Sequence, residues 1–140
     1  MADKRVEMLA SVPLFHGLSR SEIREILNSA TEVEFPPGTV IVKQGQEASD
    51  FYLISSGRAR LVVRAIREAP LDAGDYFGEI SVIDGGPRSA TITAESHVTA
   101  LRLNRENFLR ILDRHGSIGR KILAEMCRRL REAEGELVQH

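Results

Sequence analysis

Short strand-like runs separated by glycine-containing turns are the feature that most constrains the fold of this chain. Each run holds only a few residues and is rich in β-branched or other apolar side chains. The runs are 33–35, 40–42, 51–54, 58–63, 91–94 and 98–103. Many short strands with frequent turns are typical of an antiparallel sandwich or barrel. We therefore expect residues 31–103 to form an antiparallel β-structure.

A helix is expected before these strands. Ser19 and Glu22 have the spacing of a capping box, in which the side chain of each residue bonds the backbone N–H of the other. The apolar residues that follow recur on one helical face: Ile23, Ile26, Leu27 and Ala30. This pattern predicts a helix over residues 20–30.

Helical periodicity returns after residue 103. Asn104 is a candidate N-cap for a helix that extends to His115, and Ser117 is the expected N-cap of a last helix. Apolar residues of the last helix are spaced four, four, four, three and four residues apart: Ile118, Ile122, Met126, Leu130, Ala133 and Leu137. This spacing predicts a continuous apolar seam.

Length and charge narrow the class of protein. The chain has 140 residues, which suits one domain, and its 19 basic and 20 acidic side chains leave a net charge of −1. This balance does not support long-range attraction to nucleic acid or to a membrane surface. The charge is uneven, because residues 102–131 hold nine basic and three acidic side chains, a net of +6.

Cysteine content and hydropathy indicate the compartment. Cys127 is the only cysteine, so no internal disulfide can form, and we expect it in the core or in the seam of the last helix. The sequence has no run of 18 apolar residues and no evident secretory signal. We therefore expect a cytoplasmic protein that does not enter a membrane.

The segment 77–91 has the residue types of an anion site. A helix that starts just after Gly78 would direct unpaired N–H groups toward one point, and the Arg88 guanidinium matches phosphate oxygens. Glu79 adds a carboxylate that would repel a highly charged phosphate but accept from a sugar hydroxyl. A cyclic 3′,5′-phosphodiester fits this combination, since it carries one charge beside a free ribose 2′-OH.

The sequence FGEISVIDGGPRSATITA resembles the phosphate-binding cassette of the cyclic nucleotide-binding domain family, which includes catabolite activator proteins and kinase regulatory subunits. The stretches VPLFHGLS, PPGTVIVKQG, FYLISSGRARL and LNRENFLRIL resemble other parts of that domain. The resemblance implies an α+β, mainly β fold, a jelly-roll barrel (double-stranded β-helix) between an N-terminal helix and two C-terminal helices. A single domain would span 1–140, with a helical segment at 1–30, the barrel at 31–103 with its cassette at 77–91, and the B and C helices at 104–140.

The same resemblance implies roles for individual residues. Glu79 would accept from the ribose 2′-OH, and Arg88 would pair with the cyclic phosphate. Ser89 would add its hydroxyl and amide, the amide of Ser81 would bond the phosphate, and Gly78 would let the sugar approach. The remaining candidates for ligand contact are Phe77, Ile80, Leu61 and Ala90.

The basic section near the C-terminus has two interpretations. It is either a solvated face of two amphipathic helices, or the site of an arginine that stacks on the base when the last helix folds over the ligand as a lid. Arg129 is the first choice for this arginine and Arg128 the second. A nucleic-acid patch is disfavoured, because no aromatic residues are interleaved and an acidic tail follows.

Neither catalysis nor a metal is expected. The four histidines do not form the His-x-His cluster of a metal-binding barrel enzyme, and we expect each at the surface or an edge. No nucleophile–base pair can be assigned. The only small molecule expected is the ligand, with cAMP favoured over cGMP because Ser89 resembles the cAMP-binding pattern of bacterial relatives.

The expected function is therefore that of a stand-alone sensor that signals to an unknown effector protein by helix movement. A homodimer through the last helix would use the apolar seam. Three alternatives stay open: a module for a cyclic dinucleotide, a protein-interaction domain without a ligand, and a sensor fragment of a larger channel, kinase or transcription factor.

Overall fold

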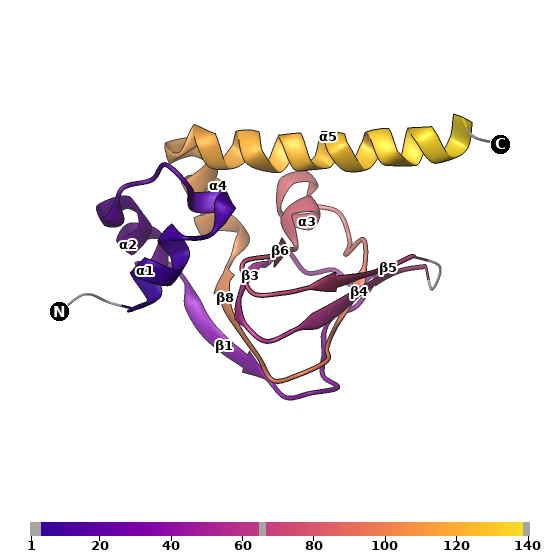
Figure 1. Ribbon diagram of the computed structural model, residues 1–140, viewed down its shortest axis with the longest axis horizontal. Coiled ribbons are helices and arrows are strands. Elements are labelled where there is room, and N and C mark those ends of the chain that lie inside the picture. Colours follow the sequence, from indigo (N-terminus) through magenta and orange to yellow (C-terminus); the bar gives the residue numbers. More distant parts are fainter. Residues whose placement is uncertain (1–3, 65–66, 139–140) are drawn as a thin grey trace.

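A computed structural model describes residues 4–64 and 67–138 of the chain. The helices are α1 (Lys4–Ala10), the short 3-10 helix η1 (Pro13–Phe15), α2 (Arg20–Asn28), α3 (Glu79–Asp84), α4 (Arg105–Arg114) and α5 (Gly116–Val138). The strands are β1 (Thr31–Phe35), β2 (Val40–Val42), β3 (Phe51–Ser56), β4 (Ala59–Val63), β5 (Arg67–Leu71), β6 (Tyr76–Phe77), β7 (Thr91–Ala94) and β8 (Val98–Leu103). Figure 1 shows the barrel below α5, with α1 and α2 at one end.

The strands form two four-stranded sheets, and every strand pair is antiparallel. One sheet has the order β1-β8-β3-β6 and the other β2-β7-β4-β5. Their inner faces share one cluster of buried side chains, to which β3 contributes Tyr52 and Ile54 and β7 contributes Ile92 and Ala94. The expected fold, a mainly β jelly roll with flanking helices, is thus confirmed.

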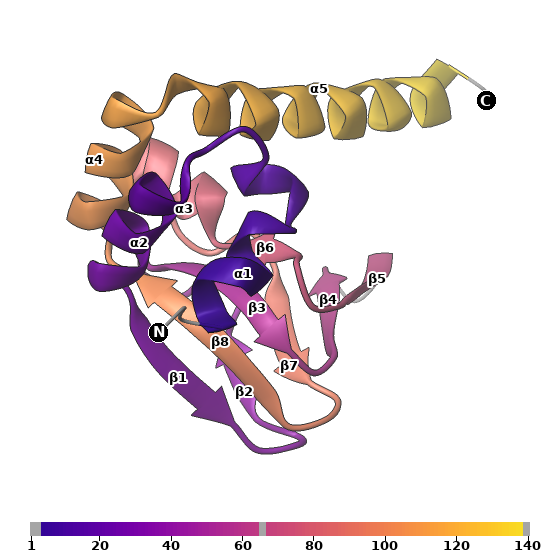
Figure 2. The ribbon, with the colours of Figure 1, turned by 60° about the vertical axis from the view of Figure 1, so that its left-hand side comes forward.

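Strand β3 is buried on both faces because it separates two cores. Side chains alternate between the faces of a strand. Tyr52 and Ile54 therefore point into the barrel, while Phe51 and Leu53 pack against the helices. The Phe51 ring stacks on Phe108 of α4 with 4.1 Å between the ring centroids. Figure 2 shows the helical layer that covers this side of the barrel.

The caps predicted from the sequence are confirmed at two helices and wrong at the third. Ser19 and Glu22 form the capping box of α2, and the Asn104 side chain accepts from the amide of Asn107 at the start of α4. Helix α2 ends at Asn28, before the expected end at residue 30. Helix α5 begins at Gly116, so Ser117 lies inside its first turn. The reason is that α4 passes into α5 through His115 alone, which leaves no room for a separate cap.

The predicted seam on α5 is buried only in part. Met126 and Ala133 are half-buried, and the side chain of Leu137 lies outside the part that the structure describes. Ile118 and Ile122 belong to the helical core, whereas Leu130 is 59% exposed, and so is Leu123 on a neighbouring face. Cys127 is exposed as well, so it does not lie in the core, while its predicted place along the seam stays a prediction. Figure 1 shows the cause, because the later turns of α5 extend past the other helices. In the part of the chain that the structure describes, no helix is long and apolar enough to cross a membrane.

Candidate functional site: a pocket at the cassette

A pocket opens between α3, the strands beside it and α5, with about 430 Å³ of space including its open mouth. Ten of the eleven residues predicted to bind a ligand line it: Leu61, Phe77, Gly78, Glu79, Ile80, Ser81, Arg88, Ser89, Ala90 and Arg129. Arg128 is the exception. Three further lining residues, Val42, Tyr76 and Ile92, were not predicted.

Gly78 brings the backbone of the cassette close to its neighbours. It is the N-cap of α3 and has a φ of 93°, a conformation that favours glycine. A Cβ atom at this position would lie 2.4 Å from the carbonyl oxygen of Asp50 and 2.8 Å from Nη1 of Arg88. The amide groups of the first turn of α3 have no acceptor within the helix. The predicted helix that starts directly after Gly78 is therefore present.

Arg88 is a buried cation without sufficient partners. Its residue surface is 4% exposed, and its Nε and Nη1 atoms are buried with no hydrogen-bond partner among the described residues. Burial lowers the pKa of its guanidinium, because desolvation disfavours the charged form. Its backbone is held from both sides, since its N–H donates to the Gln46 carbonyl at 2.9 Å and its carbonyl accepts from Gly45 at 2.8 Å. Unpaired buried donors of this kind are costly, and an anion would stabilise them.

Glu79 is a buried carboxylate at the start of α3, and it lines the same pocket as Arg88. It is 5% exposed, and burial raises the pKa of its carboxyl group above the ordinary value. Arg129 and Arg88 oppose this shift by attraction. Nη1 of Arg129 lies 3.3 Å from Oε1 of Glu79. The Glu79 carboxylate therefore lines the pocket with two arginines. Arg129 is paired with it, whereas Arg88 has unpaired nitrogen atoms.

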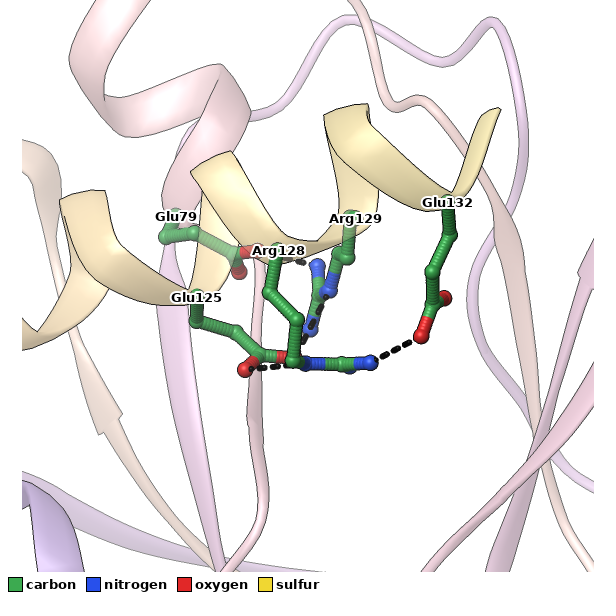
Figure 3. A network of polar contacts seen from close by, with 5 residues as sticks. All are labelled: Glu79, Glu125, Arg128, Arg129 and Glu132. Atoms are coloured by element: carbon green, nitrogen blue, oxygen red, sulfur yellow. Dashed lines mark hydrogen bonds and ion pairs between the residues drawn. The ribbon is translucent and has the colours of Figure 1, made fainter. Parts of the chain in front are cut away.

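Arg128 and Arg129 are adjacent in the chain but differ in their partners (Figure 3). Arg129 reaches from α5 toward Glu79 and also contacts Glu125 at 3.2 Å. Arg128 pairs with Glu125 and Glu132, both on its own helix, and these contacts hold it along the surface of α5. Of the two candidates, only Arg129 lines the pocket. Its contact is with the carboxylate that we expect to hold the ribose.

The two serines of the cassette have different settings. Ser81 is 2% exposed, and its hydroxyl donates to the Pro87 carbonyl at 3.2 Å, which ties α3 to the loop that follows. Ser89 is exposed at the edge of the pocket. On the apolar side, the Phe77 ring stacks on Tyr52 with 4.9 Å between the ring centroids.

Tyr76 is the most informative of the residues that the sequence analysis missed. Burial, followed by repulsion from Glu79, raises the pKa of its phenol to about 12. Its ring stacks on Phe51, so it connects the pocket with the helical core. An aromatic residue directly before Phe77 was a signal that could have been used. Val42 and Ile92 gave no comparable signal, because they read only as strand residues.

Within residues 4–64 and 67–138, no group of three or more His, Cys, Asp and Glu residues could hold a metal ion. His16 and His97 are exposed as predicted. His115 is not a surface residue, because its side chain is 9% exposed and its Nδ1 lies 3.1 Å from a carboxylate oxygen of Glu22. His140 lies outside the described residues.

Comparison with known proteins decides the family. The model of the cyclic nucleotide-binding domain matches residues 32–115, which include segment 77–91 and all of the described strands except the first residue of β1. The chain belongs to the cyclic nucleotide-binding domain family. The pocket therefore lies in the cassette region of a cyclic nucleotide-binding domain.

Several relatives of this cyclic nucleotide-binding domain are regulatory proteins. It is 36% identical over 107 residues to a cAMP-dependent protein kinase regulatory subunit of Emericella nidulans, covering 74% of this chain and 26% of the relative. It is 37% identical over 106 residues to a cGMP-dependent protein kinase of Toxoplasma gondii, covering 76% and 11%. The crystal structure of the Thermus thermophilus catabolite activator protein superposes with a TM-score of 0.81 at 37% identity, covering 89% and 61%. The domain thus spans only part of the length of each of these relatives.

Proposed function

We propose that this domain binds a cyclic 3′,5′-nucleotide in the pocket, prefers cAMP to cGMP, and regulates a partner protein without catalysing a reaction. Arg88 is the observation that carries the proposal, because its Nε and Nη1 atoms are buried and lack a partner among the described residues. A phosphate oxygen that accepts from these atoms removes the cost of leaving them unpaired.

Glu79 narrows the class of anion. The buried carboxylate near Arg88 repels a ligand with several negative charges. A cyclic phosphodiester carries only one negative charge and is repelled less. The ribose 2′-OH supplies the donor that the Glu79 carboxylate accepts. The unpaired guanidinium of Arg88 therefore matches the cyclic phosphate, and the carboxylate of Glu79 matches the ribose 2′-OH.

The preference for cAMP rests on Ser89 at the edge of the pocket. A serine at this position resembles the cAMP-binding pattern of bacterial relatives, whereas threonine here is associated with acceptance of cGMP. Similar proteins include both cAMP-dependent and cGMP-dependent kinases, so the purine must be tested directly.

Signalling would pass through α5. Arg129 reaches Glu79 from this helix, so a ligand that occupies the carboxylate changes one contact between α5 and the cassette. If two arrangements of α5 bind the ligand with different affinity, the ligand shifts the population toward the arrangement that binds it more tightly. A cytoplasmic location suits a sensor of soluble nucleotides.

A second copy of the chain is the occupant that we propose for the exposed apolar side of α5. Leu123 and Leu130 are seven residues apart and each is 59% exposed, while Met126 between them is partly buried. Heptad spacing of this kind suits a two-helix seam. Light scattering should give a dimer for the wild type and a monomer for Leu130→Glu. A wild type that stays monomeric at high concentration, with and without cAMP, would exclude the dimer.

Calorimetric titration with cAMP, cGMP and cyclic di-GMP tests the proposal against its alternatives. We expect heat of binding with cAMP, weaker binding of cGMP and none with the cyclic dinucleotide. Binding of cyclic di-GMP alone would support the dinucleotide module. Absence of binding by all three would support an interaction domain without a ligand.

A further inference from the structure

The end of the cassette helix is attached to the next helical element by one arginine. Arg105 is the first residue of α4, and its Nε donates to the carbonyl oxygen of Val82 in α3 at 2.8 Å. The last carbonyl groups of a helix have no partner within it, and a cation at this end is favourable. Its Nη2 atom also lies 3.6 Å from the position that a Cβ atom on Gly85 would occupy.

Apolar packing connects the same two helices. Val82 of α3 and Phe108 of α4 are 0% and 1% exposed and belong to one buried cluster. Asn104, directly before Arg105, caps the start of α4. Two consecutive residues therefore hold the start of α4. Asn104 caps this helix, and Arg105 bonds it to the end of α3.

The opposite end of α3 lies at the pocket. Glu79 is the first residue of α3, and Gly78 before it lines the pocket with Arg88. Because α3 has only six residues, a shift at its pocket end moves its far end too. Arg105 does not line the pocket, so its effect on a ligand has to pass through α3.

We propose that Arg105 is a positioning residue that couples α3 to α4, and thereby transmits occupancy of the pocket to α4 and α5. This inference rests on the proposed function, since it concerns how the same pocket is read out. A residue that merely caps α3 would change stability in the free protein, but it would leave the response of α4 and α5 to a nucleotide intact.

Hydrogen exchange of the full chain, measured with and without saturating cAMP, separates these roles. Arg105→Ala removes the donor, Arg105→Lys keeps the charge, and Arg110→Ala is the matched control. Arg110 is on the same helix, and among the described residues its guanidinium bonds Asn107 and Glu106, both of α4. Thermal unfolding of each variant confirms that it is folded.

We expect cAMP to change exchange in α4 and α5 of the wild type and of Arg110→Ala. Arg105→Ala should bind cAMP within about two- to tenfold of the wild type, yet lose most of that change. Arg105→Lys should restore part of it. An unaltered response of α4 and α5 in Arg105→Ala would overturn the inference.

Exchange in the free protein provides a test that does not depend on the proposed ligand. If cAMP does not bind to the wild type, the proposed function fails, but coupling of the two helices can still be measured. Arg105→Ala should then raise exchange in α3 and in the first turn of α4 together, unlike Arg110→Ala. Faster exchange in α3 with α4 unchanged would contradict coupling.

Discussion

Arg129 of α5 lies 3.3 Å from the carboxylate of Glu79 at the start of α3, although the two residues are 50 positions apart in the chain. The contact joins the last helix to the buried acceptor of the pocket. It indicates a role for Arg129 other than stacking on the base, because the guanidinium opposes the rise that burial causes in the pKa of the Glu79 carboxyl group. The position of α5 and the charge of the pocket are therefore linked.

Removal of Arg129 should weaken binding of cAMP. Arg129→Ala leaves Glu79 without its closest cation, so we expect an affinity loss of about tenfold, the equivalent of ~1.4 kcal/mol. Arg128→Ala is the matched control, since its pairs with Glu125 and Glu132 lie on the helix surface and contribute little. Calorimetry on both variants checks this. Equal losses in the two would remove Arg129 from the site.

Acid should weaken cAMP binding through Glu79. Burial raises the pKa of its carboxyl group above the ordinary 4.5, so the carboxylate is protonated at a higher pH than an exposed glutamate. The acceptor for the 2′-OH is then lost as pH falls through this raised value. Affinity for cAMP should decline in that range, while affinity for 2′-deoxy-cAMP should change less. A parallel decline in affinity for both nucleotides would argue against this role. So would a wild type whose affinity for cAMP depends on pH no more than that of Glu79→Gln.

Acid should also weaken the fold through Glu22. Its bonds to Ser19, and to a lesser degree attraction to His115, hold the pKa of its carboxyl group below the ordinary 4.5. The folded pKa is depressed, so the ionised group stabilises the fold above the unfolded value, and this contribution is lost as pH falls through the folded value. Glu22→Gln should therefore unfold with a smaller dependence on pH below 4.5. Glu32→Gln, an exposed site in β1, should match the wild type.

Gly78 should be less tolerant of a side chain than a glycine of the same conformation elsewhere. Gly78→Ala places a Cβ atom 2.4 Å from the Asp50 carbonyl oxygen, whereas Gly38, with a φ of 87°, has nothing within 4 Å. We expect Gly38→Ala to cost about 1 kcal/mol of unfolding free energy and Gly78→Ala about 3 kcal/mol. Chemical denaturation measures both. Similar losses would show that the close approach at Gly78 is easily relieved.

The parts of this fold that depend on local sequence could be predicted. The capping box at Ser19 and Glu22 spans one helical turn, and Gly78, Glu79 and Arg88 lie in one short segment. For such residues, spacing along the chain nearly determines spacing in the structure. This is why most of the residues expected to bind a ligand line one pocket.

Features that depend on contacts between distant segments were missed or wrong. The periodicity of α5 indicated an apolar face, but it could not show that Leu130 on this face stays exposed, or that Cys127 lies outside the core. Val42 and Ile92 reach the pocket because two strands far apart in sequence pair there. The contact of Arg129 with Glu79 likewise depends on the path of α5 over the cassette.

Titration of the wild type and of Arg88→Ala with cAMP tests the central claim most directly. Arg60→Ala is the control, because Arg60 is an exposed arginine of β4 that pairs with Glu68. If the buried guanidinium holds the cyclic phosphate, Arg88→Ala should lose about 2–5 kcal/mol of binding free energy, and Arg60→Ala should bind like the wild type. Equal affinity of the wild type and Arg88→Ala for cAMP would contradict the account.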